Sequence, residues 1–245
     1  MAGPGGPQRG APLPYELLAG VIPTKAGWLI ASAKLQGIQM YPNEPELLDD
    51  LQDVIDYRPS FKVIALGAPV GLLEEPVEGG RACDRAARQL IGFPRAGAIP
   101  TPPVRKALEA QTYEEAARLS GGMGAVTWGL LRRYAEVARE MAPYRQRTIF
   151  EVQPELSLYQ LNDNKPMQFS KRSHIGMEER KDLLKGRIQG MERIVEADVP
   201  GVKPWQLIDA AACLWTTRRI ASRAMTRIPE DPEWDETGLR MEYVY

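Results

Sequence analysis

Two apolar runs separated by a helical segment most constrain how this chain of 245 residues can fold. Residues 17–22, LLAGVI, and residues 61–66, FKVIAL, have the length and apolar character of buried strands. Between them, residues 44–56 carry leucines and other apolar residues at helical spacing. A strand, a helix and a second apolar strand form a crossover unit, which indicates an α/β fold.

Further strands and helices follow from the pattern of the remaining segments. Residues 28–33 and 37–41 follow the first run after turn residues, which is typical of a β-meander. Residues 147–152 and 239–245 predict two later strands. The predicted helices cover residues 81–90, 104–110, 113–119, 125–141, 177–195 and 205–225. This order predicts a mixed sheet flanked by helices, with a helical insertion over residues 73–145.

The composition is that of an ordinary globular protein, with 44% hydrophobic and 26% charged residues. We expect one domain over residues 15–245, preceded by a disordered tail over residues 1–14, which are rich in glycine and proline. The tail lacks the apolar region of a secretory signal, and no apolar run approaches the roughly 18 residues that span a membrane. The two cysteines form no disulfide framework, so a cytoplasmic location without membrane contact is expected.

Charge limits the kinds of partner. The formal net charge is −1, whereas a dedicated nucleic-acid-binding domain is usually basic as a whole. Contact with phosphate would therefore have to come from a local patch. The best candidate is the segment 170–174, SKRSH, in which Lys171 and Arg172 precede a predicted helix.

Several segments, taken in order, resemble one known family. They are AGVIPTKAGWLIA (19–31), LGAPVGL (66–72), RACDRAARQL (81–90), EVQPELS (151–157), SKRSHIGMEER (170–180), IDAAACLWTTRRI (208–220) and GLRME (238–242). Together they resemble the predicted RNase H-like nuclease family, which is defined by a domain of unknown function. The resemblance covers residues 19–245, nearly the whole chain.

The resemblance implies an RNase H-like fold whose acidic side chains meet at one end of the sheet. There they would hold divalent metal, which activates water for phosphodiester cleavage. Two positions depart from this pattern, because Ile22 and Gly67 stand where the family has aspartates. Neither residue can bind a metal through its side chain. Glu151 and Asp209 match two acidic positions that the family retains.

Smaller departures lie near the retained carboxylates. Gln153 replaces a histidine of the family motif, and Pro204 and Trp205 replace an acidic pair. Glu155 also matches the family, and we interpret it as a partner within a helix or turn. The charged segment that begins at Arg81 is interpreted as fixing a helix onto the sheet.

These observations favour a catalytically degenerate, RNase H-like pseudoenzyme that acts by binding a protein or nucleic-acid partner. The near-neutral charge favours a protein partner. The alternative is a weak nuclease or phosphodiesterase in which Glu151 and Asp209 hold one Mg²⁺ or Mn²⁺ and Lys171 or Arg172 contacts the substrate. No cofactor is firmly predicted otherwise, and enzymatic activity is left open with non-catalytic binding favoured.

A third hypothesis is a structural role. In it the chain is a subunit of a larger assembly and docks through the proline-rich loop at 94–103 or through the N-terminal tail. A large exposed apolar patch would be typical of such a subunit. The sequence predicts no oligomeric state.

Overall fold

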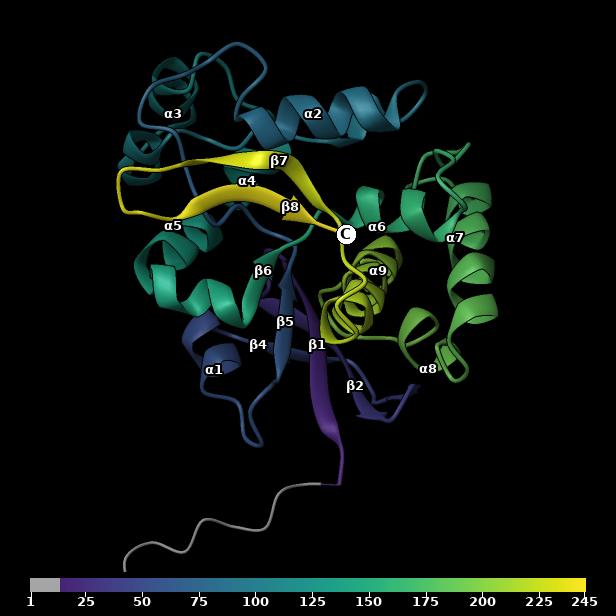
Figure 1. The fold of residues 1–245 in the computed structure, drawn as a ribbon. Helices are drawn as coiled ribbons and strands as arrows, with labels where there is room; N and C mark the ends of the chain where they lie inside the picture. The colour runs from purple at the N-terminus through teal and green to yellow at the C-terminus, as the bar shows by residue number, and fades with distance from the viewer. Residues whose placement is uncertain (1–13) are drawn as a thin grey trace, which may run out of the picture.

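The computed structural model describes residues 14–245, so the tail predicted for residues 1–14 lies, apart from its last residue, outside the described residues. Within the described range, six strands form one mixed sheet and two further strands form a separate hairpin. Nine α-helices and three short 3₁₀-helices surround them (Figure 1). The predicted α/β class, with a mixed sheet flanked by helices, is confirmed.

The elements have the following bounds. The strands are β1 (Glu16–Pro23), β2 (Trp28–Gln36), β3 (Gln39–Pro42), β4 (Glu46–Leu48), β5 (Val63–Leu66), β6 (Ile149–Glu151), β7 (Arg227–Trp234) and β8 (Arg240–Val244). The α-helices are α1 (Leu51–Ile55), α2 (Ala82–Ile91), α3 (Tyr113–Leu119), α4 (Ala125–Gly129), α5 (Leu131–Glu140), α6 (Pro154–Leu161), α7 (His174–Arg187), α8 (Glu192–Val195) and α9 (Pro204–Ala221). The 3₁₀-helices are η1 (Ala96–Ala98), η2 (Arg105–Glu109) and η3 (Pro143–Arg147).

The main sheet has the order β3-β2-β1-β5-β6, with β4 also paired to β2. Strands β1 and β2 are antiparallel, whereas β1, β5 and β6 run parallel to one another. The crossover predicted between the first and second apolar runs is therefore present. Because the three parallel strands end at the same edge, the residues that follow them come together there.

Alternate residues of β1 enter two different cores. Leu18 and Ile22 pack with residues of α9 on one face, whereas Ala19 and Val21 pack with residues of α1 and α5 on the other. Figure 1 shows α9 and α1 at opposite sides of the strands. A Cβ atom at Gly20 would lie 2.2 Å from the carbonyl oxygen of Ala210, so only glycine permits this close packing of α9 on β1.

Four predicted helices differ from those observed, and one of them, predicted at residues 104–110, is the 3₁₀-helix η2. Residues 46–48 of the helix predicted at 44–56 form β4 instead, because they pair with residues 28–30 at the edge of the sheet. The helix predicted at 125–141 is divided at Leu130 into α4 and α5, and that predicted at 177–195 is divided into α7 and α8. In both long segments the apolar pattern continues across the break, so periodicity alone could not reveal it.

Besides β4 and the short 3₁₀-helices η1 and η3, two elements lie outside the predicted set. Helix α6 follows β6 directly, and β7 pairs with the predicted terminal strand β8 to form the separate hairpin. In Figure 1 this yellow hairpin lies between α2 and the end of β6. Helices α2 to α5 lie in the connection between β5 and β6. Among residues 14–245, no helix combines the length and apolar character needed to cross a membrane.

Candidate functional site

A cleft of about 540 Å³ lies where the three parallel strands end. Ile22 and Pro23 at the end of β1, Gly67 after β5 and Gln153 after β6 all line it. In open α/β sheets this edge is the usual place for a ligand. The cleft is therefore the first candidate for a functional site.

One part of the cleft wall is basic and aromatic. Lys171 and Arg172 precede α7, and both lie over the ring of Trp205 in α9. The Nζ atom of Lys171 is 4.9 Å from the ring centroid, and the Cζ atom of Arg172 is 5.6 Å from it. Such cation–π contacts hold the two cations at the cleft. The adjacent residues Lys171 and Arg172, predicted as substrate-binding, thus line the same cleft as Asp209.

Asp209 is buried in α9 and forms an ion pair with Lys171 through its Oδ2 atom. Its side chain is only 6% exposed, whereas that of Lys171 is 30% exposed. The other carboxylate oxygen, Oδ1, has no hydrogen-bond partner among the residues that the structure describes. Because an unsatisfied buried oxygen is costly, this atom has the capacity to accept a further hydrogen bond.

Glu155 lies in the same cleft and not only within its helix. It is buried in the first turn of α6, and its Oε1 atom is 2.7 Å from Nη2 of Arg180. Burial raises the pKa of Glu155, and the positive charge of Arg180 lowers it. The negative charge of Asp209 raises this pKa further, and the positive charge of Lys171 lowers it. These four charged groups therefore form one electrostatic cluster.

Glu151 belongs to a different cluster. Its carboxylate forms two hydrogen bonds with the guanidinium of Arg81, at 2.6 and 2.9 Å, and accepts a third, at 2.8 Å, from the backbone N–H of Val70. Arg81 also pairs with Asp84, and the hydroxyl of Tyr243 donates to Asp84 at 2.6 Å. All four side chains are buried. Arg81, at the start of α2, thus contacts Glu151 of β6 and Tyr243 of β8, which is the arrangement expected of a residue that fixes its helix onto the sheet.

Glu151 does not line the cleft, and its carboxylate is bound by other residues. Burial raises the pKa of Glu151, although the charge of Arg81 and the hydrogen bonds from it act against that rise. Both carboxylate oxygens are already occupied by Arg81 and Val70. The structure therefore brings Asp209, Lys171 and Arg172 together at the cleft, while Glu151 lies in the Arg81 cluster next to it.

Two uncharged residues occupy the positions at which the resemblance implies aspartates. Ile22 and Gly67 both line the cleft. A Cβ atom built on Gly67 would lie 2.8 Å from the Cγ2 methyl of Ile22. The isoleucine thus fills the space that a side chain at position 67 would need. Among residues 14–245, no group of three or more histidine, cysteine, aspartate or glutamate side chains gathers as a metal site would require.

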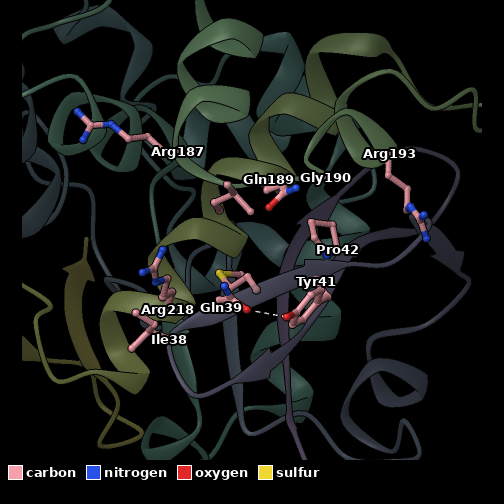
Figure 2. A pocket seen from close by; sticks show the side chains of 11 residues that line it. Ile38, Gln39, Tyr41, Pro42, Arg187, Gln189, Gly190, Arg193 and Arg218 are labelled. Carbon is pink, nitrogen blue, oxygen red and sulfur yellow. Dashed lines mark hydrogen bonds between the residues drawn. The ribbon is translucent and has the colours of Figure 1, made fainter.

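A second groove, of about 500 Å³, lies between β3 and the segment that joins α7 to α8. Arg187, Arg193 and Arg218 line it. Figure 2 shows these arginines at separate places around the groove and not directed at one another. Two of them have acidic partners, because Arg187 contacts Asp163 and Arg193 contacts Glu44. The groove contains none of the predicted site residues, so the cleft at the strand ends is the stronger candidate.

Sequence reasoning missed part of the cleft. The sequence singles out neither Arg95 nor Arg180 as a site residue, yet both line the cleft beside Trp205. Arg95 comes from the proline-rich loop and Arg180 from the middle of α7. No local spacing links either residue to Asp209. The one available signal was the match of Glu155 to the family motif.

In a comparison with known families, the family described as "Protein of unknown function (DUF429)" matches residues 20–234. No curated protein and no solved structure matches the chain.

Proposed function

This chain belongs to the DUF429 family of proteins of unknown function, and we propose that its cleft binds a single nucleic-acid strand without cleaving it. The proposal treats the domain as an RNase H-like pseudoenzyme. The observation that carries it is the placement of Lys171 and Arg172 over Trp205, at the edge where the parallel strands end. A positively charged groove with aromatic side chains beside it is the usual means of holding a single strand.

The charge of the cleft supports an anionic ligand. Its basic residues are Arg95, Lys171, Arg172 and Arg180, and its carboxylates are Glu155 and Asp209. The lining thus has two more positive than negative charges, although the whole chain has a net charge of −1. The sequence favoured a protein partner because of that overall charge, whereas the local excess of positive charge favours phosphate.

Apolar side chains complete the cleft. Val126, Leu130 and Tyr134 line it, and the side chain of Val126 is largely exposed. Apolar and aromatic surface beside cations suits a strand whose bases and phosphates need different contacts. A short phosphate-bearing strand is therefore a better match to this lining than an acidic peptide, which would leave the apolar part uncovered.

The lack of cleavage rests on the missing carboxylates. Two-metal hydrolysis needs several anionic oxygens around two ions about 3.5–4 Å apart. Here Ile22 and Gly67 supply none, and Glu151 is held by Arg81. The alternative of a weak nuclease with one metal would have to rely on Asp209 and Glu155, both of which already contact a cation.

Fluorescence anisotropy of labelled single-stranded DNA and RNA of twelve nucleotides tests the proposal. We expect binding that weakens with salt, no cleavage with Mg²⁺ or Mn²⁺, and a log–log salt slope reduced by about one unit in Arg172→Ala. Arg193→Ala is the matched control, because Arg193 lies in the second groove. Equal binding by both variants, or no binding by the wild type at low salt, would contradict the proposal.

The assembly-subunit hypothesis has less support. The most exposed large apolar residue, Phe93, lies beside the proline-rich loop and is 93% exposed. Other exposed apolar side chains include Ile38, in the turn between β2 and β3, and Trp234, the last residue of β7.

A further inference from the structure

The ion pair between Lys171 and Asp209 lies where the family resemblance implies a divalent metal. The pair contacts through Nζ of Lys171 and Oδ2 of Asp209, and the aspartate side chain is 6% exposed. Its second oxygen is buried, lacks a partner among the described residues, and belongs to a residue that lines the cleft. An aspartate with one oxygen neutralised and the other free is an incomplete cation site.

The residues present do not fit a resident divalent ion. Mg²⁺ and Mn²⁺ prefer several anionic oxygen ligands. Asp209 and Glu155 are the only carboxylates among the residues that line the cleft, and each already has a basic partner, Lys171 and Arg180. An ion entering beside Asp209 would meet the positive charge of Lys171 at short range, and this repulsion would weaken its binding.

We propose that the ammonium group of Lys171 takes the place of the metal ion. It neutralises Asp209, keeps divalent cations out of the cleft, and presents its remaining N–H donors to the ligand. The contact of Lys171 with Trp205 holds the ammonium in this position. The exclusion of metal stands on the charge arrangement alone; only the contact with ligand phosphate rests on the proposed function.

Manganese binding, followed by electron paramagnetic resonance of free Mn²⁺, tests the exclusion. The wild type is expected to show no saturable binding at millimolar Mn²⁺. Lys171→Ala leaves Asp209 without its counter-ion, so Mn²⁺ affinity should rise by roughly tenfold or more. Adding Asp209→Asn to that variant should abolish the gain, and Lys171→Arg should behave as the wild type because it restores the positive charge.

Two further variants keep the test decisive. Lys171→Gln retains a hydrogen-bond donor for Asp209 but not the charge, so it should also gain Mn²⁺ binding if Lys171→Ala fails to fold. Lys181→Ala is the matched control, because Lys181 lies on α7, pairs with Glu178 and does not line the cleft. It should gain no binding.

The outcomes separate this inference from the proposed function. Saturable Mn²⁺ binding by the wild type that disappears in Asp209→Asn would overturn the inference. It would also be overturned if Lys171→Ala and Lys171→Gln both fold and neither gains Mn²⁺ affinity. Oligonucleotide binding by the wild type should be equal in EDTA and in Mg²⁺. If oligonucleotides fail to bind at all but the Lys171 variants gain Mn²⁺, the proposed function is wrong and the inference holds.

Discussion

The Cγ2 methyl of Ile22 occupies the space that a side chain at Gly67 would require, since a Cβ atom at position 67 would lie 2.8 Å from that methyl. Ile22 is the residue before the last of β1 and Gly67 follows β5, so the two residues are neighbours across the parallel pair of strands. The size of the side chain at position 22 is therefore sterically linked to the absence of a side chain at position 67. A carboxylate introduced at position 67 alone would meet this methyl group.

A double-mutant cycle should reveal this steric link. Gly67→Ala should lower the free energy of unfolding by about 1–3 kcal/mol through overpacking. Ile22→Ala should lower it by about 2–5 kcal/mol, because Ile22 is buried. The double variant should lose about 0.5–3 kcal/mol less unfolding free energy than the sum of the two single losses, since the smaller residue at position 22 makes room for a side chain at position 67. Urea denaturation measures all three. Additivity within about 0.5 kcal/mol would show that the two positions are independent.

Gly20→Ala should destabilise the fold more than an ordinary overpacking substitution. The new Cβ would lie 2.2 Å from both the carbonyl oxygen of Ala210 and the amide nitrogen of Leu214. These are backbone atoms, so a side-chain movement cannot relieve the contact. We expect a loss of about 3 kcal/mol or more, or failure to fold. Gly186→Ala in α7 is the matched control, because nothing lies within 4 Å of its Cβ position, and it should gain about 1 kcal/mol. Thermal unfolding of both variants makes the comparison.

Tyr134 should make the fold sensitive to alkaline pH. Burial raises the pKa of Tyr134 to about 12 from its ordinary value of 10.0. Between these values the folded chain keeps the proton that the unfolded chain releases. Stability is therefore highest below pH 10 for this group and falls as pH rises through the window, by up to about 1.4 kcal/mol per pH unit. Tyr134→Phe should remove this part of the slope in urea denaturation from pH 9 to 11.

Val137→Ala serves as the control for that experiment. Val137 is a buried apolar residue on the same helix, α5. Its truncation should lower stability at every pH and leave the slope unchanged. A Tyr134→Phe variant with the wild-type slope would show that Tyr134 titrates as it does in the unfolded chain.

Substitutions in the Arg81 cluster should affect stability and not the cleft. Glu151→Gln leaves the buried guanidinium of Arg81 with one carboxylate partner, Asp84, and should cost about 3–5 kcal/mol. Tyr243→Phe removes a neutral donor to Asp84 and should cost about 1–3 kcal/mol. Chemical denaturation measures both. If Glu151→Gln costs under about 1 kcal/mol, the ion pair does not hold α2 and β6 together as the geometry indicates.

Much of the sheet could be predicted because its signals are local. The runs at residues 17–22, 28–33 and 61–66 match β1, β2 and β5, since an apolar run of this length between turn residues has the length of a buried strand and is shorter than most helices. The pairing of residues 46–48 with β2 could not be predicted, because leucines at helical spacing there suit an edge strand equally well. Strand pairing depends on residues that are distant in the sequence.

The candidate site was predictable only in outline. The parallel strands predict that residues after β1, β5 and β6 meet, and Asp209 with Lys171 and Arg172 indeed lines that edge. Which charges pair there depends on tertiary contacts. Lys171 is 38 residues from Asp209, and Arg81 is 70 residues from Glu151. The spacing of residues along the sequence does not predict contacts between residues so far apart in the chain. The sequence therefore could not predict that Glu151 and Asp209 lie in different clusters.

The position of Tyr243 affects how the chain folds while it is being synthesised. Its hydroxyl completes the Arg81 cluster from a residue 162 positions later in the sequence. During synthesis at the usual rate, Arg81 and Asp84 are made roughly ten to thirty seconds before Tyr243. Throughout that interval their charges lack the last strand that buries them. The cluster is therefore incomplete until Tyr243 has been made, and before that the growing chain has its sheet and α2 without β8, which contacts both α2 and β6.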